Sequence, residues 1–448
     1  MPPAIEPRTL KGFRDLPPAL MIPRERVLEA ARRVYRSYGF APIDTPALEY
    51  ADVLLGKAGG ETERQVYRFR DQGDRDVALR FDLTVPFARY AAQHVTRPDC
   101  GVPFKRYAMG PVWRGENTSP GRYREFWQCD FDTIGTTATS ADAEVVLVVH
   151  DLFAALEIER FTIRLNNRLV LTGVLETVGV ADKAAELLRS LDKLAKAGRE
   201  GVIAEMVREA GVTTEQAGQV LALAETEGSN ADILAQIEAQ FGANPKAAEG
   251  IAKLREVLAT AAAVGIPEGR VRLDLSIARG LDYYTGTIYE TFLDDLPGIG
   301  SVCSGGRYDN LAGLYTNAVL PGVGASLGVD RLLTAMGELN HPWLASGKAT
   351  PADVLVVVFD AKYGTLYQRA AQELRAAGVA TEVYPEAKKP KVQFEYANRR
   401  GFRVALIGGP DEFAAGLWKV KDLRARTEAT AEPAAVVTHI HRMLAGTP

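Results

Sequence analysis

The amino-acid sequence predicts an α+β protein with an antiparallel sheet and flanking helices, an all-helical insertion and a C-terminal α/β domain. Up to about residue 165, strand-like segments cluster without the regular crossover helices that parallel sheets need. Residues 166–270 change character, because Ala, Leu, Glu and Lys dominate there and favour helices. From about residue 352 onward, strand-like runs such as "VLVVVF" alternate with helical segments, which is typical of a compact α/β domain.

These observations divide the chain into four segments. The sheet domain has a first part, 1–165, and a second part, 271–335, on either side of the helical insertion, 166–270. A linker, "LNHPWLASGKATPAD", then separates the sheet domain from the α/β domain, 352–448. A chain of 448 residues is long enough for two or three such domains.

Composition and charge bound the class of protein. Hydrophobic residues make up 47% of the chain and charged residues 25%, as in ordinary soluble globular proteins. No apolar run approaches the roughly 18 residues that a membrane span needs, and the N-terminal stretch lacks a signal-peptide core. Cys100, Cys129 and Cys303 are few and far apart, which suits a reducing compartment and gives no zinc-binding spacing. We therefore expect a cytoplasmic protein with no membrane contact and no dedicated metal site. The formal charge of −4 leaves only local basic patches for a nucleic acid.

Start and stop signals support the helices. Apolar residues recur at helical spacing through "PRERVLEAARRVYRSYGF", and Gly39 closes that segment. In the insertion, "TTEQ" at 213–216 predicts a capping box, and Asn244-Pro245 predicts an N-cap followed by the first helical residue.

The segment "VRLDLSIARGLDYYTG" raises the first question about function. Leu273, Leu275 and Ile277 alternate with polar residues, so a strand is expected, and continuing the alternation points Arg279 inward. A buried charge costs several kcal/mol unless it meets an opposite charge. Arg279 therefore belongs either to a structural ion pair or to a site for an anionic ligand.

The segment "FKRYAMGPVWRGENTSPGRYREFWQCDFDTIG", 104–135, predicts a long β-hairpin with a polar loop. Guanidinium groups form bidentate bonds to phosphate, and an aromatic ring can stack on a base. A surface hairpin with salt bridges is the alternative, but the alternation of polar side chains on one strand face favours a binding site. The side chains in question are Arg114, Glu116, Arg122, Arg124, Glu125, Phe126, Gln128, Asp130 and Asp132.

Three shorter segments add candidates. We expect Asp82 and Thr84 on one strand face just before Pro86, where a carboxylate and a hydroxyl could hold an ammonium group. In "SVCSGGRYDNLAGLY", a Gly-Gly pair would let the backbone approach a ligand beside Tyr308. "PGVGASLGVDRLL" places Arg331 on a helix. Taken alone, each segment is better explained by a turn or by close packing.

Two common nucleotide-binding motifs are absent from the sequence. It contains no GxxxxGK[ST] loop, and no GxGxxG follows a strand and opens a helix. Two arginines on strands, a third on a late helix and a nearby aromatic residue instead indicate a nucleotide held on an antiparallel sheet.

Together, these segments resemble class II aminoacyl-tRNA synthetases, and within them the histidyl-tRNA synthetase family. "YGFAPIDTPALE" resembles class II motif 1, the hairpin 104–135 resembles motif 2, and "GVGASLGVDRLL" resembles motif 3. "RGLDYYTG" and "CSGGRYDNL" resemble the two signatures of the histidyl enzymes. The resemblance spans nearly the whole chain. It implies that the sheet domain is catalytic and that the α/β domain binds an anticodon.

The resemblance also implies a reaction. The carboxylate of L-histidine attacks the α-phosphorus of ATP, pyrophosphate leaves, and the histidyl group passes to the 3′ end of tRNA(His). Arg114 and Arg279 would be the catalytic residues that hold the α-phosphate, and Mg²⁺ would bridge the phosphates. The residues implied for ATP are Arg114, Glu116, Arg122, Phe126 and Arg331.

Histidine would be read by a polar pocket, which rejects apolar isosteres because its buried groups would otherwise go unpaired. In this reading, Asp82, Thr84 and Gln128 take the α-amino group, while Asp132 and Tyr284 read the imidazole. The full implied set is Asp82, Leu83, Thr84, Arg114, Gln128, Asp132, Arg279, Tyr283, Tyr284 and Tyr308.

The tail segment "KKPKVQFEYANRRGFR" is the implied tRNA contact, because it mixes basic groups with aromatic rings. A helix with a solvated basic face is the simpler explanation of the residues alone. The implied residues are Lys388, Lys389, Lys391, Arg399 and Arg400. Because motif 1 forms the dimer interface in class II enzymes, the resemblance also implies a homodimer.

One departure and three rivals qualify the resemblance. The tip of the motif 2 loop, "NTSPG", has no basic residue before Arg122, so we expect weak dependence on the extra 5′ guanosine of histidine tRNA. The rivals are a catalytically inactive paralogue that acts as a regulatory subunit, another class II synthetase, and a simple RNA-binding module. The presence of "RGLDYYTG" and of the tail domain argues against the first, and the paired tyrosines after Arg279 argue against the second. The third does not explain an inward Arg279.

Overall fold

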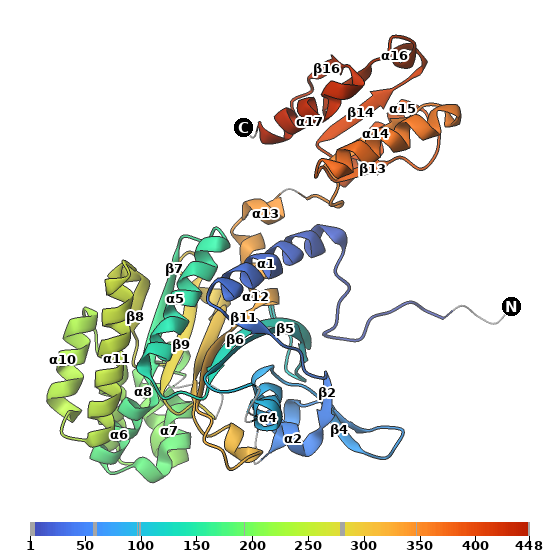
Figure 1. The fold of residues 1–448 in the computed structure, drawn as a ribbon. Coiled ribbons are helices and arrows are strands. Elements are labelled where there is room, and N and C mark those ends of the chain that lie inside the picture. Colours follow the sequence, from blue (N-terminus) through green and yellow to red (C-terminus); the bar gives the residue numbers. More distant parts are fainter. Residues whose placement is uncertain are drawn as a thin grey trace. The chain divides into compact units, whose positions relative to one another are not determined.

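The protein is seen in a computed structural model that describes residues 5–56, 61–95, 97, 100–191, 193–277, 283–345 and 347–446. The chain forms two compact units (Figure 1). One unit contains Met1–Phe13 and Val27–Ala335, and the other contains Arg14–Arg26 and Met336–Pro448.

An eight-stranded sheet is the centre of the first unit, with the strand order β1-β5-β6-β11-β10-β9-β7-β8. Its strands are β1 (Ala41–Pro42), β5 (Phe104–Trp113), β6 (Glu125–Ile134), β7 (Phe161–Asn167), β8 (Val271–Leu273), β9 (Thr287–Leu293), β10 (Cys303–Tyr308) and β11 (Gly322–Gly328). The inner pairings are antiparallel, whereas the outermost pairs, β1 with β5 and β7 with β8, are parallel. The predicted antiparallel sheet is therefore confirmed except at its two edges.

Helices surround this sheet and fill the segment between β7 and β8. Around the sheet lie α1 (Pro18–Ser37), α2 (Ala51–Leu55), α3 (Glu61–Gln65), α4 (Thr84–His94), α5 (Thr139–Ala155) and α12 (Val329–Glu338). Between β7 and β8 lie α6 (Arg168–Val178), α7 (Ala184–Leu191), α8 (Leu194–Ala210), α9 (Thr214–Ala224), α10 (Asn230–Phe241) and α11 (Pro245–Ala263). Within the described part of 168–270, every regular element is helical, as the composition predicts.

The two faces of the large sheet have different neighbours, because side chains alternate along each strand. On one face, Tyr107 and Phe131 are in register and pack against Tyr35 of α1. The same face continues to Tyr289, whose hydroxyl donates to the carbonyl of Asp142 in α5 at 2.9 Å. Helix α5 runs along the sheet there (Figure 1). The polar residues of β6 therefore lie on the opposite face.

Two glycines bring helices α6 and α11 close together. A Cβ atom on Gly173 would lie 2.6 Å from the backbone nitrogen of Ala247, and one on Gly250 would lie 2.8 Å from the nitrogen of Val170. The expected caps are also confirmed. Thr213 forms a capping box with Gln216, and Asn244 caps the helix that begins at Pro245.

A small antiparallel sheet, with the order β2-β4-β3, flanks the large one. It consists of β2 (Leu48–Tyr50), β3 (Arg68–Arg70) and β4 (Asp76–Leu79). Ala78 packs with α2 on one face. On the other face, Leu48, Tyr50 and Phe69 are 39%, 54% and 47% exposed, although all three are large and hydrophobic.

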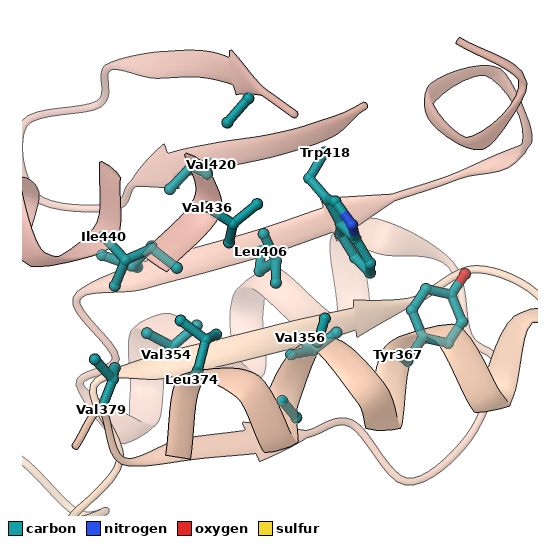
Figure 2. Packing of buried hydrophobic residues seen from close by; sticks show 14 of the residues in the cluster. Val354, Val356, Tyr367, Leu374, Val379, Leu406, Trp418, Val420, Val436 and Ile440 are labelled. Atoms are coloured by element: carbon teal, nitrogen blue, oxygen red, sulfur yellow. The ribbon is translucent and has the colours of Figure 1, made fainter. Parts of the chain in front are cut away.

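The second unit is built on a five-stranded sheet with the order β13-β12-β14-β15-β16. Its strands are β12 (Val354–Val358), β13 (Thr381–Val383), β14 (Val404–Gly408), β15 (Trp418–Asp422) and β16 (Glu428–Ala431). Its helices include α13 (Pro342–Ala345), α14 (Gly364–Ala376), α15 (Pro390–Arg400), α16 (Pro410–Ala414) and α17 (Val436–Ala445). Figure 2 shows its core, in which Val356 and Leu406 of the sheet lie among side chains of α14, β15 and α17, including Leu374, Trp418 and Ile440.

The structure corrects three sequence-based expectations about local structure. The strand expected through Ile277 ends at Leu273, although Leu275 and Ile277 stay buried beyond it. Thr84 begins helix α4 instead of lying on a strand, because the Asp82 carboxylate accepts hydrogen bonds from backbone N–H groups of the first turn. In the second unit, β15 and β16 add antiparallel pairings to the expected strand–helix alternation.

The close approach of α6 and α11 gives a test of the fold. Replacing Gly173 with Ala puts a methyl group against backbone, which cannot move aside as a flexible side chain can. We expect Gly173→Ala to reduce the free energy of unfolding by about 1–3 kcal/mol, measured by urea denaturation. Gly218→Ala is the matched control in helix α9, because its Cβ would meet nothing within 4 Å. It should leave stability unchanged or raise it by up to about 1 kcal/mol. Equal loss in both variants would contradict this packing.

Candidate active site

The polar face of the large sheet carries the site. Asp132 of β6 pairs in register with Arg106 of β5 on one side and with Gly324 of β11 on the other. Gln128 and Asp130 share this face, because they lie at two-residue intervals along the same strand. All these side chains are buried, so this polar cluster, called the recess below, is enclosed by the protein and not spread over an open surface.

Glycines of β10 and β11 make room for the larger side chains of the site. A Cβ on Gly324 would lie 2.3 Å from the Oδ1 atom of Asp132, and one on Gly322 would lie 2.3 Å from the ring of Tyr308. A Cβ on Gly306 would lie 2.9 Å from the ring of Tyr284. Gly306, Gly322 and Gly324 are thus required by the side chains that lie over them.

Asp132 is held from two directions. The Tyr308 hydroxyl donates to its Oδ1 atom at 2.6 Å, and Nη2 of Arg106 lies 2.7 Å from its Oδ2 atom. Burial raises the pKa of both the Asp130 and the Asp132 carboxyl groups, and the charge of Arg106 opposes that rise. Burial also raises the pKa of Tyr308 well above its usual value, so its phenol remains a neutral donor.

Asp82, Tyr283 and Thr84 form a second wall of the pocket. Oδ1 of Asp82 accepts from the N–H groups of Thr84 and Val85 at 3.1 and 2.9 Å, and the Tyr283 hydroxyl donates to Oδ2 at 3.3 Å. The Tyr283 ring lies edge-on to the rings of both Tyr284 and Tyr308. Burial raises the pKa of Asp82, and the N–H groups and the charge of Arg114 oppose it.

Arg114 follows directly after β5 and is held by aromatic rings and one carbonyl group. Its Nε donates to the carbonyl of Phe81 at 3.0 Å, and its guanidinium lies over the rings of Phe81 and Phe126 at 4.3 and 5.1 Å. Burial lowers the pKa of Arg114, while Asp82 and Glu116 oppose that change. Within the described residues, no carboxylate forms an ion pair with Arg114, so its charge is incompletely neutralised.

The loop between β5 and β6 brings further charges to this place. Glu116 and Arg122 form an ion pair at 3.2 Å, and Gly121 passes against Arg331 of α12, with its Cβ position 3.3 Å from the Cα atom of Arg331. Nη1 of Arg331 donates to the carbonyl of Ser301 at 2.5 Å. Burial lowers the pKa of Arg331, and the nearby Arg122 adds to that effect.

The N-terminal stretch supports the same loop. The backbone N–H of Arg124 donates to the carbonyl of Gly12 at 2.9 Å, and Nη1 donates to the carbonyl of Lys11 at 3.3 Å. A Cβ on Gly12 would lie 2.6 Å from the side chain of Arg124, so glycine is needed there. Arg124 is thus a structural residue of the loop.

The structure brings most of the predicted residues together. The following lie around the recess or on the loop beside it: Asp82, Thr84, Arg114, Glu116, Arg122, Phe126, Gln128, Asp132, Tyr283, Tyr284, Tyr308 and Arg331. Leu83 contributes its backbone, because its side chain is buried in an apolar cluster and its carbonyl accepts from Arg106. Arg279 lies outside the described residues.

Sequence reasoning missed Arg106, which is fully buried beneath the recess. The signal was present, because alternation along β5 points Arg106 to the same face as the β6 carboxylates. Arg307, which lies next to Tyr308, has a different role. Its guanidinium forms a buried ion pair with Asp142 and a second ion pair with Asp309, so it fixes β10 to α5.

The basic residues expected to bind tRNA lie on α15 and just before it. Lys388, Lys389, Lys391 and Arg399 are exposed, while Arg400 is half-buried. Arg400 lies over the Tyr396 ring at 5.9 Å. The helix is fixed to the sheet by buried Gln393, whose amide donates to the carbonyl of Val358 at 2.7 Å and accepts from its N–H at 2.9 Å.

The described residues hold neither a candidate metal site nor a candidate membrane span. No group of three or more His, Cys, Asp or Glu residues among them could hold a metal ion. None of the helices in that part of the chain has the length and apolar character needed to cross a bilayer.

Comparison with known proteins places this chain in a family. Residues 12–332 match the family model of histidyl-tRNA synthetase, and residues 353–442 match that of the anticodon binding domain. The histidine–tRNA ligase of Rhodopirellula baltica is 56% identical over 419 residues, covering 94% of each chain. That of Wolinella succinogenes is 44% identical over 422 residues, with 94% of each chain covered.

Solved structures agree with these matches. The histidyl-tRNA synthetase from Nostoc sp. superposes with a TM-score of 0.87 at 34% identity, covering 98% of this chain and all (100%) of that one. A Bacillus halodurans protein described as an ATP phosphoribosyltransferase regulatory subunit/histidyl-tRNA synthetase gives a TM-score of 0.73 at 22% identity, covering 90% and 100%. That second likeness shows the fold alone. The family match, the relatives and the class II fold agree, and the chain belongs to the histidyl-tRNA synthetase family.

Proposed function

We propose that this protein is an active histidine–tRNA ligase, which uses ATP to join L-histidine to the 3′ end of tRNA(His). The observation that carries the proposal is the buried polar recess around Asp132, next to an arginine without a carboxylate partner among the described residues, Arg114. Such a recess suits a small polar amino acid, and such an arginine suits a phosphate.

Histidine would be recognised at both ends. Its α-ammonium group has only donors, so it fits the Asp82 carboxylate, the Thr84 hydroxyl and the Gln128 amide oxygen. Oε1 of Gln128 has no hydrogen-bond partner among the described residues although it is buried, which leaves it open to the substrate. The imidazole N–H would be accepted by Asp132, with Tyr284 as its second polar partner and Tyr308 orienting the carboxylate.

The placement of histidine and ATP beside these residues would then allow histidine to be activated. A carboxylate oxygen of histidine attacks the α-phosphorus of ATP, the bond to the bridging oxygen breaks, and pyrophosphate leaves with the electron pair. Negative charge grows on the α-phosphate oxygens, and Arg114 would stabilise it from a desolvated position where its charge acts strongly. By family resemblance, Arg279 would act from the other side.

The loop and α12 would hold the rest of the nucleotide. Phe126 presents a ring to the adenine, Glu116 and Arg122 lie on the loop beside it, and Arg331 would hold the outer phosphates. Mg²⁺ keeps several waters and binds mainly through phosphates, so we propose that it arrives with ATP. This fits a site in which the described residues include no metal-binding cluster.

Transfer to tRNA completes the reaction. A ribose hydroxyl of the 3′-terminal nucleotide attacks the histidyl carbonyl group, and AMP leaves. The exposed basic residues on and before α15 would contact the anticodon stem-loop, where Lys and Arg meet phosphates and splayed bases stack on rings.

We further propose a homodimer in the cytoplasm. Leu48, Tyr50 and Phe69 form an exposed hydrophobic face on the small sheet, and a second copy of the chain would cover it. The cytoplasmic location rests on the cysteine content of the sequence. The segments 1–165, 166–270, 271–335 and 352–448 remain our proposal for the domain boundaries.

The activation step can be measured by ATP–pyrophosphate exchange with each amino acid in turn. We expect exchange with histidine alone, because the recess pairs both ends of that substrate. Arg114→Ala and Arg279→Ala should each reduce histidine-dependent exchange by about 10²–10³-fold, since each removes a stabilising charge from the transition state. Circular dichroism serves as the folding control. Exchange with another amino acid, or full activity in either variant, would contradict the proposal.

The proposed dimer predicts different sedimentation results for two matched variants, a monomer for Phe69→Glu and a dimer for Val264→Glu. Phe69→Glu introduces a charge into the exposed face of the small sheet and should convert the dimer to a monomer. Val264→Glu is the control, because Val264 is also exposed, at 58%, but follows α11 far along the chain. A parent that sediments as an active monomer would refute the dimer.

The tip of the motif 2 loop predicts how the 5′ end of the tRNA is recognised. Asn117, Thr118 and Ser119 are exposed, and a tight turn between Ser119 and Arg122 closes the tip without a basic side chain ahead of Arg122. We expect transcripts of tRNA(His) with and without the extra 5′ guanosine to be aminoacylated with kcat/KM values within about tenfold of each other. A far larger loss on removing the nucleotide would show that another part of the chain reads it.

A further inference from the structure

Arg106 is a charged residue with no exposure to solvent, at the floor of the candidate site. Its Nη2 atom lies 2.7 Å from Oδ2 of Asp132 and 4.0 Å from Oδ2 of Asp130, and it donates to the carbonyl of Leu83 at 3.0 Å. The guanidinium also lies over the ring of Phe87 at 4.4 Å. One group therefore touches two carboxylates, a backbone carbonyl and an aromatic ring.

Stability alone gives no reason for this arrangement. Among the described residues, Nε and Nη1 of Arg106 have no hydrogen-bond partner, although both are buried. Replacing a buried ion pair by apolar side chains is often neutral or stabilising, whereas buried donors without partners are costly. The charge therefore stands where the fold does not require one, next to the residue that would read the substrate.

The contacts of Arg106 join the two walls of the pocket. Leu83 lies between Asp82 and Thr84, which would take the α-amino group, while Asp132 would read the imidazole. The same nitrogen atom, Nη2, contacts both. Its position therefore fixes the spacing between the group that meets one end of histidine and the group that meets the other.

The geometry at Asp132 leaves an acceptor open. Oδ1 accepts from Tyr308, whereas Oδ2 has no hydrogen bond from the described residues, even though the side chain is 3% exposed. Arg106 approaches Oδ2 closely as an ion pair without the alignment of a hydrogen bond. A lone pair on this oxygen thus remains for a substrate N–H, and an ionised carboxylate can only accept.

We propose that Arg106 is a positioning residue for histidine recognition, which orients the Asp132 carboxylate toward the imidazole and sets its distance from the turn at Leu83. The inference rests on the proposed role of Asp132. Asp130 is the balancing charge: with Arg106 and Asp132 it forms a buried cluster of two carboxylates and one guanidinium.

The test is a double-mutant cycle on the full-length protein with Arg106→Met, Asp132→Asn and the combination. The readouts are the KM for histidine and the KM for ATP in pyrophosphate exchange. If Arg106 acts through Asp132, Arg106→Met should raise the histidine KM about tenfold or more and leave the ATP KM within about twofold. The histidine KM of the double variant should then exceed that of the more impaired single variant by no more than about twofold. Effects that multiply would overturn the inference.

Two further variants separate positioning from charge balance and from folding. Arg106→Met with Asp130→Asn removes one charge of each sign and gives a folded test protein if the single variant is unstable. We expect its histidine KM to stay raised, whereas recovery to the parent value would show that Arg106 only neutralises Asp130. Arg80→Met is the control for loss of a buried arginine, because Arg80 is held by the carbonyls of Thr45 and Pro111. A selective rise in histidine KM in this control would also overturn the inference.

A result that refutes the proposed role of Asp132 can be distinguished from one that refutes only the role of Arg106. If Asp132→Asn leaves the histidine KM unchanged, the proposed reading of the imidazole is wrong and the inference falls with it. If Asp132→Asn raises that KM while Arg106→Met does not, only the positioning role of Arg106 is refuted.

Discussion

The pairing of β6 with β11, which sets Asp132 opposite Gly324, is the constraint on which the pocket depends. A slip of one residue would turn Asp132 to the face packed by α1 and α5, and it would bring a larger residue opposite the carboxylate. The residue opposite Gly324 on the next strand, Gly306 of β10, is also a glycine. Because these two positions have no side chain, Asp132 and Tyr284 can lie flat against the backbone of their neighbours. The missing side chains at Gly324 and Gly306 of the central strands thus make room for the recess.

The arginines around the recess differ in how completely they are neutralised. Arg307 is fully used by Asp142, Asp309 and backbone carbonyls, which fits a role in holding strand to helix. Arg114 and Arg331 are anchored through backbone carbonyls instead, and burial lowers the pKa of both. An anchored, desolvated cation with few protein counter-charges suits a polyphosphate, because such a ligand would supply the missing charge without reorganising the site. The "GGRYD" segment thus contains one residue that fixes strand to helix, Arg307, next to one that lies at the candidate site, Tyr308.

Much of the fold and of the site follows from local rules that a single sequence carries. The hairpin 104–135 is marked by alternation around a polar loop, and the caps at Thr213 and Asn244 are marked by side-chain chemistry. The errors came where long-range contacts decide. Asp82 was expected on a strand, but its carboxylate finds the free N–H groups of α4, a competition that alternation does not reveal. Arg106 was overlooked because an arginine is normally exposed, and only the pairing with β6 shows that it is enclosed.

The attachment of the N-terminal stretch to Arg124 has a practical consequence. The carbonyls of Lys11 and Gly12 help to hold the strand end from which Phe126 projects, so these two residues brace the part of β6 where we propose that adenine binds. Affinity tags or truncations that disturb Lys11 and Gly12 would therefore shift Phe126 and, under the proposed function, change the affinity for ATP without altering Phe126 itself. Engineering at this end of the chain would therefore also alter the candidate active site.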